Sequence, residues 1–231
     1  MSEGKGKFPI TQEQIMKVLD VIYQKAQGGV KGVSPSVKEL AQSYLNKQPD
    51  IPVAAKNMIR NQVLKCATSG FITGFGGIVT LPVTVPANVG SVLYVQMRMV
   101  ACTAFLAGYD MDSDQTQTFI YACLAGVSIN EIVKKTGIKI AQSIATTAVK
   151  KIPGAALTKI NQKVGFRLLT KFGEKGLINF GKLIPVAGAV VSGGFDLAET
   201  RIIGNRAYRW FFEGDFSEKK AAGDKNNARE S

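Results

Sequence analysis

The feature that most constrains the fold is a long stretch without charged side chains, residues 66–97. A helix needs about 20 apolar residues to span a bilayer, so this stretch is long enough to cross or enter one. Glycine and proline interrupt it, however, and would break a continuous helix. We therefore expect a glycine-faced helix, a proline turn and a new helix over 89–109. The residues expected at this packed turn are Gly70, Gly74, Gly76, Gly77 and Pro82.

A second uncharged, glycine-rich segment runs from Leu183 to Phe195 and contains Gly188, Gly193 and Gly194. Small residues let two helices approach closely, both in a protein core and in a membrane. The sequence therefore predicts two glycine-rich apolar helical hairpins, which either pack together or dip into the bilayer.

The rest of the chain is helical in pattern. A capping box of Thr11 and Gln14 precedes apolar residues at helical spacing up to Ala26. A second helix is predicted with Ser34 as its N-cap and Pro35 at its first position. No segment alternates with a period of two for long enough to form a sheet. The expected fold is an all-α, single-domain helical bundle.

Three segments are expected along the 231 residues. Residues 1–50 should form N-terminal amphipathic helices, and 51–213 the main helical domain. Residues 214–231 are polar, rich in charge of both signs, and predicted to be disordered. The polar N-terminus lacks the apolar core of a secretory signal, which favours a cytoplasmic location.

Positive charge is concentrated in one part of the chain. The net charge is +12, and residues 132–182 hold eleven Lys or Arg and a single acid. Five cations recur at every fourth residue and would share one helix face: Lys159, Lys163, Arg167, Lys171 and Lys175. Like charges at this spacing repel, so an anionic surface suits the face, although a solvated face has the same pattern. Phe166 and Phe172 are expected on or near the apolar side, which disfavours a stacking platform for nucleic acid.

Several kinds of catalytic or cofactor site are disfavoured. The chain has no histidine, which excludes triads with a His base. The cysteines Cys66, Cys102 and Cys123 are odd in number and far apart, so neither a disulfide framework nor a zinc site is expected. The run from Gly74 to Gly77 is not followed by Gly-Lys-Ser/Thr, so it does not predict a phosphate loop. We expect no metal, no cofactor and no catalysis.

Arg98 lies among apolar residues in the predicted 89–109 helix and needs a buried partner. Asp196 is the one acid at the end of the second glycine-rich segment. We therefore predict a buried ion pair between Arg98 and Asp196.

The segments Thr73–Pro82, Tyr109–Asp110, Leu183–Asp196 and Thr200–Gly204 together resemble the EcsC family. The resemblance extends over about residues 53–212. It implies a mostly helical bacterial protein of poorly defined activity, from a family named after a component encoded beside an ABC transporter. The segment before Pro86 lacks the acidic residue expected in many relatives, so no role based on that acid is expected here.

The function predicted from these features is that of a membrane-associated accessory or regulatory protein. Its basic face would bind anionic membrane lipid, and a membrane transporter or another membrane protein is a further expected partner. It would lie at the cytoplasmic membrane, either peripheral or partly inserted. Two alternatives stay open: a hydrolase-type enzyme without a His base, and a basic nucleic-acid-binding protein, although nucleic acid is a disfavoured partner.

Overall fold

The computed structural model describes residues 11–66, 87–137, 145–172 and 189–216. Over these ranges the chain is helical and contains no β-strand, so the all-α prediction is confirmed. The helices in chain order are α1 (Gln12–Gly28), α2 (Val37–Leu45), α3 (Ile51–Cys66), α5 (Ala87–Leu106), α6 (Asp114–Ala125), α7 (Asn130–Lys134), α8 (Ala145–Lys150), α9 (Gly154–Phe172) and α11 (Ala189–Glu213).

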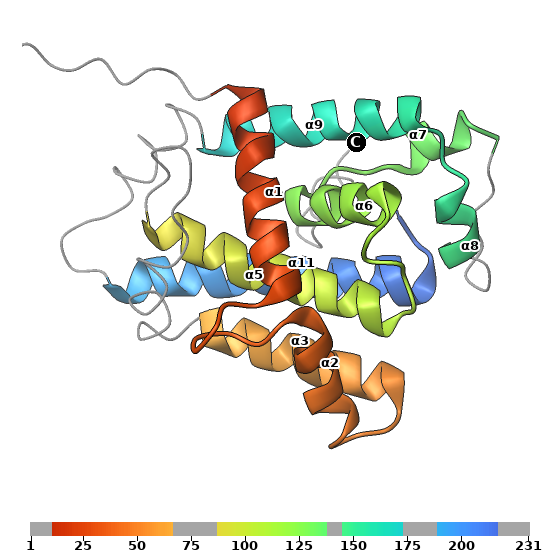
Figure 1. Cartoon of the computed structure of the whole chain (residues 1–231). Coiled ribbons are helices and arrows are strands. Elements are labelled where there is room, and N and C mark those ends of the chain that lie inside the picture. Colours follow the sequence, from red (N-terminus) through yellow and green to blue (C-terminus); the bar gives the residue numbers. More distant parts are fainter. Residues whose placement is uncertain (1–10, 67–86, 138–144, 173–188, 217–231) are drawn as a thin grey trace, which may run out of the picture.

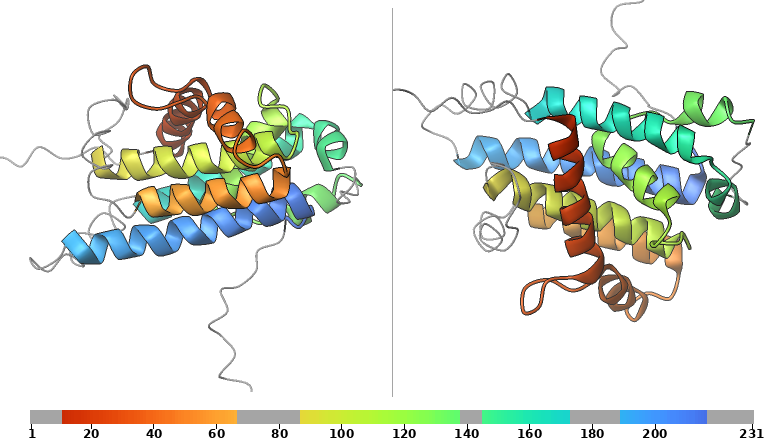
Figure 2. Two further views of the ribbon diagram at one scale, coloured as in Figure 1. Left: turned by 90° about the horizontal axis from the view of Figure 1, so that it is seen from below. Right: turned by 45° about the horizontal axis from the view of Figure 1, so that its top comes forward.

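Three long helices, α3, α5 and α11, pack against one another and form the base of the bundle (Figures 1 and 2). Helices α5 and α11 run in the same direction, whereas α3 runs in the opposite direction. The three helices approach closely at Gly204 of α11, because a Cβ atom there would lie 2.6 Å from Ile59 Cγ2 of α3 and 3.3 Å from Met99 Sδ of α5. A glycine at this position therefore allows the three helices to meet.

Helix α1 crosses this layer and connects it to α9 (Figure 1). Its buried stripe, which includes Leu19, Ile22 and Tyr23, packs toward α5. At its N-terminal end, α1 contacts α9, where Gly165 lies beside Gln12 and Met16. Helix α6 also packs on both α5 and α9. Helix α9 is therefore in contact with both α1 and α6.

The sequence predicts the N-cap of α1 correctly but not that of α2. The capping box of Thr11 and Gln14 is present as expected. The expected N-cap Ser34 is wrong, because α2 is capped by Ser36, whose hydroxyl accepts the backbone N–H of Glu39. The Glu39 carboxylate accepts the Ser36 N–H in return, which makes a reciprocal capping box two residues further along the chain.

The apolar segments predicted to form hairpins lie largely outside the described residues. Within the described part, α5 begins at Ala87 and α11 at Ala189, so the backbones of Gly193 and Gly194 belong to the first turns of a continuous helix. No helix in the described ranges combines the length and apolar character needed to cross a membrane.

Candidate functional site

Helix α9 has the amphipathic pattern that its sequence predicts. Ile160, Val164 and Leu168 are buried against the bundle. Lys159, Lys163 and Arg167 precede them by one position and are exposed. Buried apolar residues at this spacing anchor the helix, so the orientation of its basic side is set by core packing.

The other two predicted members of the basic face are Lys171 and Lys175. Lys171 Nζ donates to the Glu199 carboxylate of α11, and both side chains are partly buried. This ion pair ties the C-terminal end of α9 to α11. Lys175 lies outside the described residues.

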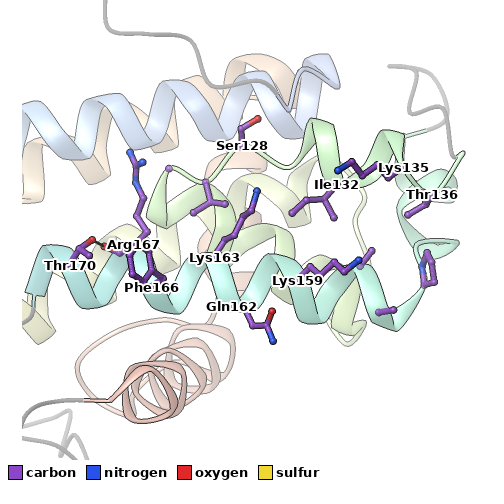
Figure 3. Close-up of a pocket in the computed structure, with 15 residues that line it drawn as sticks. Ser128, Ile132, Lys135, Thr136, Lys159, Gln162, Lys163, Phe166, Arg167 and Thr170 are labelled. Atoms are coloured by element: carbon purple, nitrogen blue, oxygen red, sulfur yellow. Dashed lines mark hydrogen bonds between the residues drawn. The ribbon is translucent and has the colours of Figure 1, made fainter.

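The three exposed cations line a groove of about 940 Å³ between α9 and the segment from the end of α6 to just after α7 (Figure 3). Its residues are Gly126, Val127, Ser128, Ile132, Lys135, Thr136, Pro153, Ala155, Ala156, Lys159, Gln162, Lys163, Phe166, Arg167 and Thr170. A volume of this size is typical of pockets that hold small molecules.

The charge of the groove has one sign. Lys135, just after α7, adds a fourth cation from the wall opposite Lys159 and Lys163 (Figure 3). No Asp or Glu is among the lining residues in the described part of the chain. Four cations around one concave surface create a positive potential that attracts anions. Sequence reasoning missed Lys135 because nothing in the local pattern links it to α9.

Phe166 differs from the sequence-based expectation. The residue is 60% exposed and lies at the groove between Lys163 and Arg167, not on the apolar side of α9. Position 166 falls between the buried positions 164 and 168, on the outer half of the helix. The groove therefore combines cations with an exposed aromatic ring and aliphatic side chains.

One wall of the groove depends on Gly126, which ends α6 in the left-handed conformation with φ of 71°. A Cβ atom at this position would lie 3.1 Å from the Arg206 guanidinium of α11. Arg206 Nη1 in turn donates to the Cys123 carbonyl at 2.8 Å, which satisfies a carbonyl at the end of α6. This contact positions the turn from which Val127 and Ser128 line the groove.

Arg98 occupies a separate, buried polar cluster on α5 and is only 2% exposed. One of its terminal nitrogens, Nη2, donates to Gln62 Oε1 at 2.8 Å. The other, Nη1, donates to Ser34 Oγ, which also accepts the Tyr94 hydroxyl at 2.9 Å. Burial lowers the pKa of Arg98, and the nearby Tyr94 opposes this shift. The side chain predicted to cap α2, Ser34, is thus part of this cluster.

The described hydrogen-bond partners of Arg98 are neutral. Asp196 lies in α11, but its side chain is outside the described part of the structure, so the Arg98–Asp196 ion pair stays a prediction. The predicted packing residues Gly70, Gly74, Gly76, Gly77, Pro82 and Gly188 also fall outside the described ranges.

Comparison with known proteins gives a family match over residues 9–211, to the EcsC protein family. The chain belongs to the EcsC family. A relative in Bacillus subtilis (strain 168), the uncharacterized protein YdbA, is 26% identical over 196 residues, which cover 78% of this chain and 68% of the relative. No solved structure gives a significant match.

The family match begins before the predicted boundary at residue 51 and includes α1 and α2. In this EcsC-family chain, the two N-terminal helices contact α5, and α1 also contacts α9. Helix α1 thereby helps to hold α9, the helix that forms one wall of the groove. Within the described residues of the protein, no cluster of His, Cys, Asp and Glu could hold a metal ion.

Proposed function

We propose that this EcsC-family protein is a membrane-associated accessory protein whose α9 groove faces and binds anionic lipid at the cytoplasmic membrane. The observation that carries this proposal is the composition of the groove. Lys135, Lys159, Lys163 and Arg167 surround it without a carboxylate among the described lining residues, and Phe166 stands exposed between two of the cations. Cations beside an exposed aromatic ring are the combination found on surfaces that lie in a membrane interface.

Lipid is favoured over nucleic acid because of the uncharged part of the groove. Val127, Ile132 and Ala156 are aliphatic, and Phe166 is the one aromatic among the described lining residues. Binding of single-stranded nucleic acid generally uses several aromatic rings on which successive bases stack. The exposed Phe166, together with the small exposed parts of these aliphatic side chains next to the cations, suits an acyl chain beside a phosphate headgroup.

Co-sedimentation with vesicles tests the proposal. The protein is expected to pellet with vesicles of phosphatidylglycerol and phosphatidylcholine, not with vesicles of phosphatidylcholine alone, and salt should release it. A basic residue near an anionic membrane contributes about 1 kcal/mol, so the double variant Lys159→Glu, Lys163→Glu should bind at least ~30-fold more weakly.

The matched control is Lys38→Glu, Lys47→Glu, which makes the same change in net charge at two exposed lysines far from the groove. It should retain most of the binding if α9 is the binding surface. Equal loss in both double variants would show that net charge alone controls association. Absence of pelleting by the native protein would refute the proposal, and tight binding of single-stranded RNA in its place would favour the nucleic-acid alternative.

A further inference from the structure

The groove has two charged walls, which distinguishes it from a flat basic surface. Lys159 and Lys163 project from α9, whereas Lys135 belongs to the segment on the other side (Figure 3). A flat membrane contacts a protein from one side only. Cations on opposite walls instead suit an anionic group that enters the space between them.

The groove also has apolar side chains, and as a whole it offers more space than a phosphate ion needs. Ile132 of α7 and Val127 of the turn between α6 and α7 are largely buried side chains that line one wall, and Phe166 is exposed on the α9 wall. The volume of about 940 Å³ exceeds what inorganic phosphate would fill. A ligand that matches both parts carries an anionic group and a hydrocarbon portion.

Beyond general attraction to an anionic surface, we propose that this groove binds a single molecule of a phosphate-bearing lipid. The phosphate lies between Lys135 on one wall and Lys159 and Lys163 on the other, and the start of the hydrocarbon part lies against Ile132 and Phe166. Hydrogen bonds between ammonium groups and phosphate oxygens are charge-assisted and stronger than neutral ones. This inference rests on the proposed membrane function and specifies its ligand.

Monomeric short-chain lipid separates groove binding from surface binding. Dihexanoyl phosphatidylglycerol below its micellar concentration presents no membrane surface, so only a discrete site can bind it. Isothermal titration should give saturable one-to-one binding, whereas dihexanoyl phosphatidylcholine and inorganic phosphate should each bind at least ~10-fold more weakly. Equal affinity for inorganic phosphate would overturn the assignment, because the hydrocarbon part would then contribute nothing.

Two neighbouring lysines provide a matched pair of variants. Lys135→Gln should weaken binding of the short-chain lipid by ~10-fold, the effect expected for losing one charge-assisted contact. Lys134→Gln removes the same charge one residue earlier, where the side chain is exposed and pairs with Glu131 outside the groove. It should leave affinity unchanged. Equal effects of the two variants would overturn the assignment.

A groove-filling pair tests the site without changing charge. Ala155→Trp places a large ring at an exposed position that lines the groove, and Thr158→Trp does so at an exposed position on the same helix outside it. Only Ala155→Trp should abolish binding of the short-chain lipid, and helical circular dichroism of both variants checks their fold. Vesicle binding without any binding of monomeric lipid would overturn this inference and leave the proposed function intact. Binding of monomeric lipid without vesicle binding would refute the proposed membrane association and leave the groove as a lipid-binding site.

Discussion

Replacing Gly204 by alanine tests the packing of the three long helices that form the base of the bundle. The new methyl carbon would lie 2.6 Å from Ile59 Cγ2, closer than real Cβ contacts, and 3.3 Å from Met99 Sδ. Met99 has a flexible side chain that is able to move, but Ile59 is β-branched and stiff at χ1. The backbone of α3 or α11 must therefore shift to accommodate the methyl group.

Two opposing effects set the change in the free energy of unfolding. Alanine is favoured over glycine in a helix interior by about 1 kcal/mol, whereas overpacking a core costs roughly 1–3 kcal/mol. The net result for Gly204→Ala should be a destabilisation of about 1 kcal/mol. Gly165→Ala is the control, because its Cβ would meet Gln12 Cβ at 3.5 Å, an ordinary contact, so helix propensity should dominate and stabilise the protein.

Thermal unfolding followed by circular dichroism measures the difference between the two variants. With roughly 2–4 °C per kcal/mol for a chain of this size, Gly165→Ala should melt about 4–8 °C above Gly204→Ala. If Gly204→Ala were as stable as Gly165→Ala, the close approach of α3, α5 and α11 at this glycine would be refuted.

Three further predictions concern other parts of the molecule. Arg98→Met leaves the buried Gln62 Oε1 without its described donor and removes one of two donors to Ser34 Oγ, so it should cost about 1–3 kcal/mol. Gln62→Leu should cost less in the Arg98→Met background than alone, and strict additivity in urea unfolding would contradict the shared hydrogen bond. Burial raises the pKa values of Cys102 and Cys123 to about 12, so neither thiol should react with a thiol reagent at pH 8 until the protein unfolds, as peptide mass mapping of the labelled sites would reveal. The ion pair with Lys150 lowers the pKa of the Asp110 carboxyl. The stability that this ion pair contributes is present above the pKa of Asp110 in the unfolded chain, and it is lost as pH falls through the lower pKa of the folded protein. Lys150→Met should raise the Asp110 pKa in an NMR titration, and an unchanged value would exclude the contact.

Much of the fold follows from local patterns. The capping box at Thr11, the spacing of apolar residues in α9 and the glycine that ends α6 each act within a few residues, so the sequence alone predicts helices there. The N-cap of α2 was also predictable from the sequence, since Ser36 followed by Glu39 is a capping-box pattern. Pro35 favours Ser34 as the N-cap, but the reciprocal bonds between Ser36 and Glu39 set the start of α2.

The site was predictable only in part. The exposed cations of α9 follow from helical periodicity, but Lys135 joins them only because α7 packs beside α9. Burial of Arg98 was predictable from its apolar neighbours, whereas its contacts with Ser34 and Gln62 depend on how the α1–α2 loop and α3 meet α5. Such contacts between distant segments leave no local periodic signal.

The most direct test of the central claim places a fluorescent reporter at the exposed aromatic position of the groove. Phe166→Trp adds an exposed indole, while Trp210 is buried in the core and gives a constant background. If the α9 groove lies against anionic lipid, emission of this variant should shift to shorter wavelength with phosphatidylglycerol vesicles, and lipids brominated on their acyl chains should quench it; phosphatidylcholine vesicles should have neither effect. Emission that stays unchanged with anionic vesicles would contradict the account.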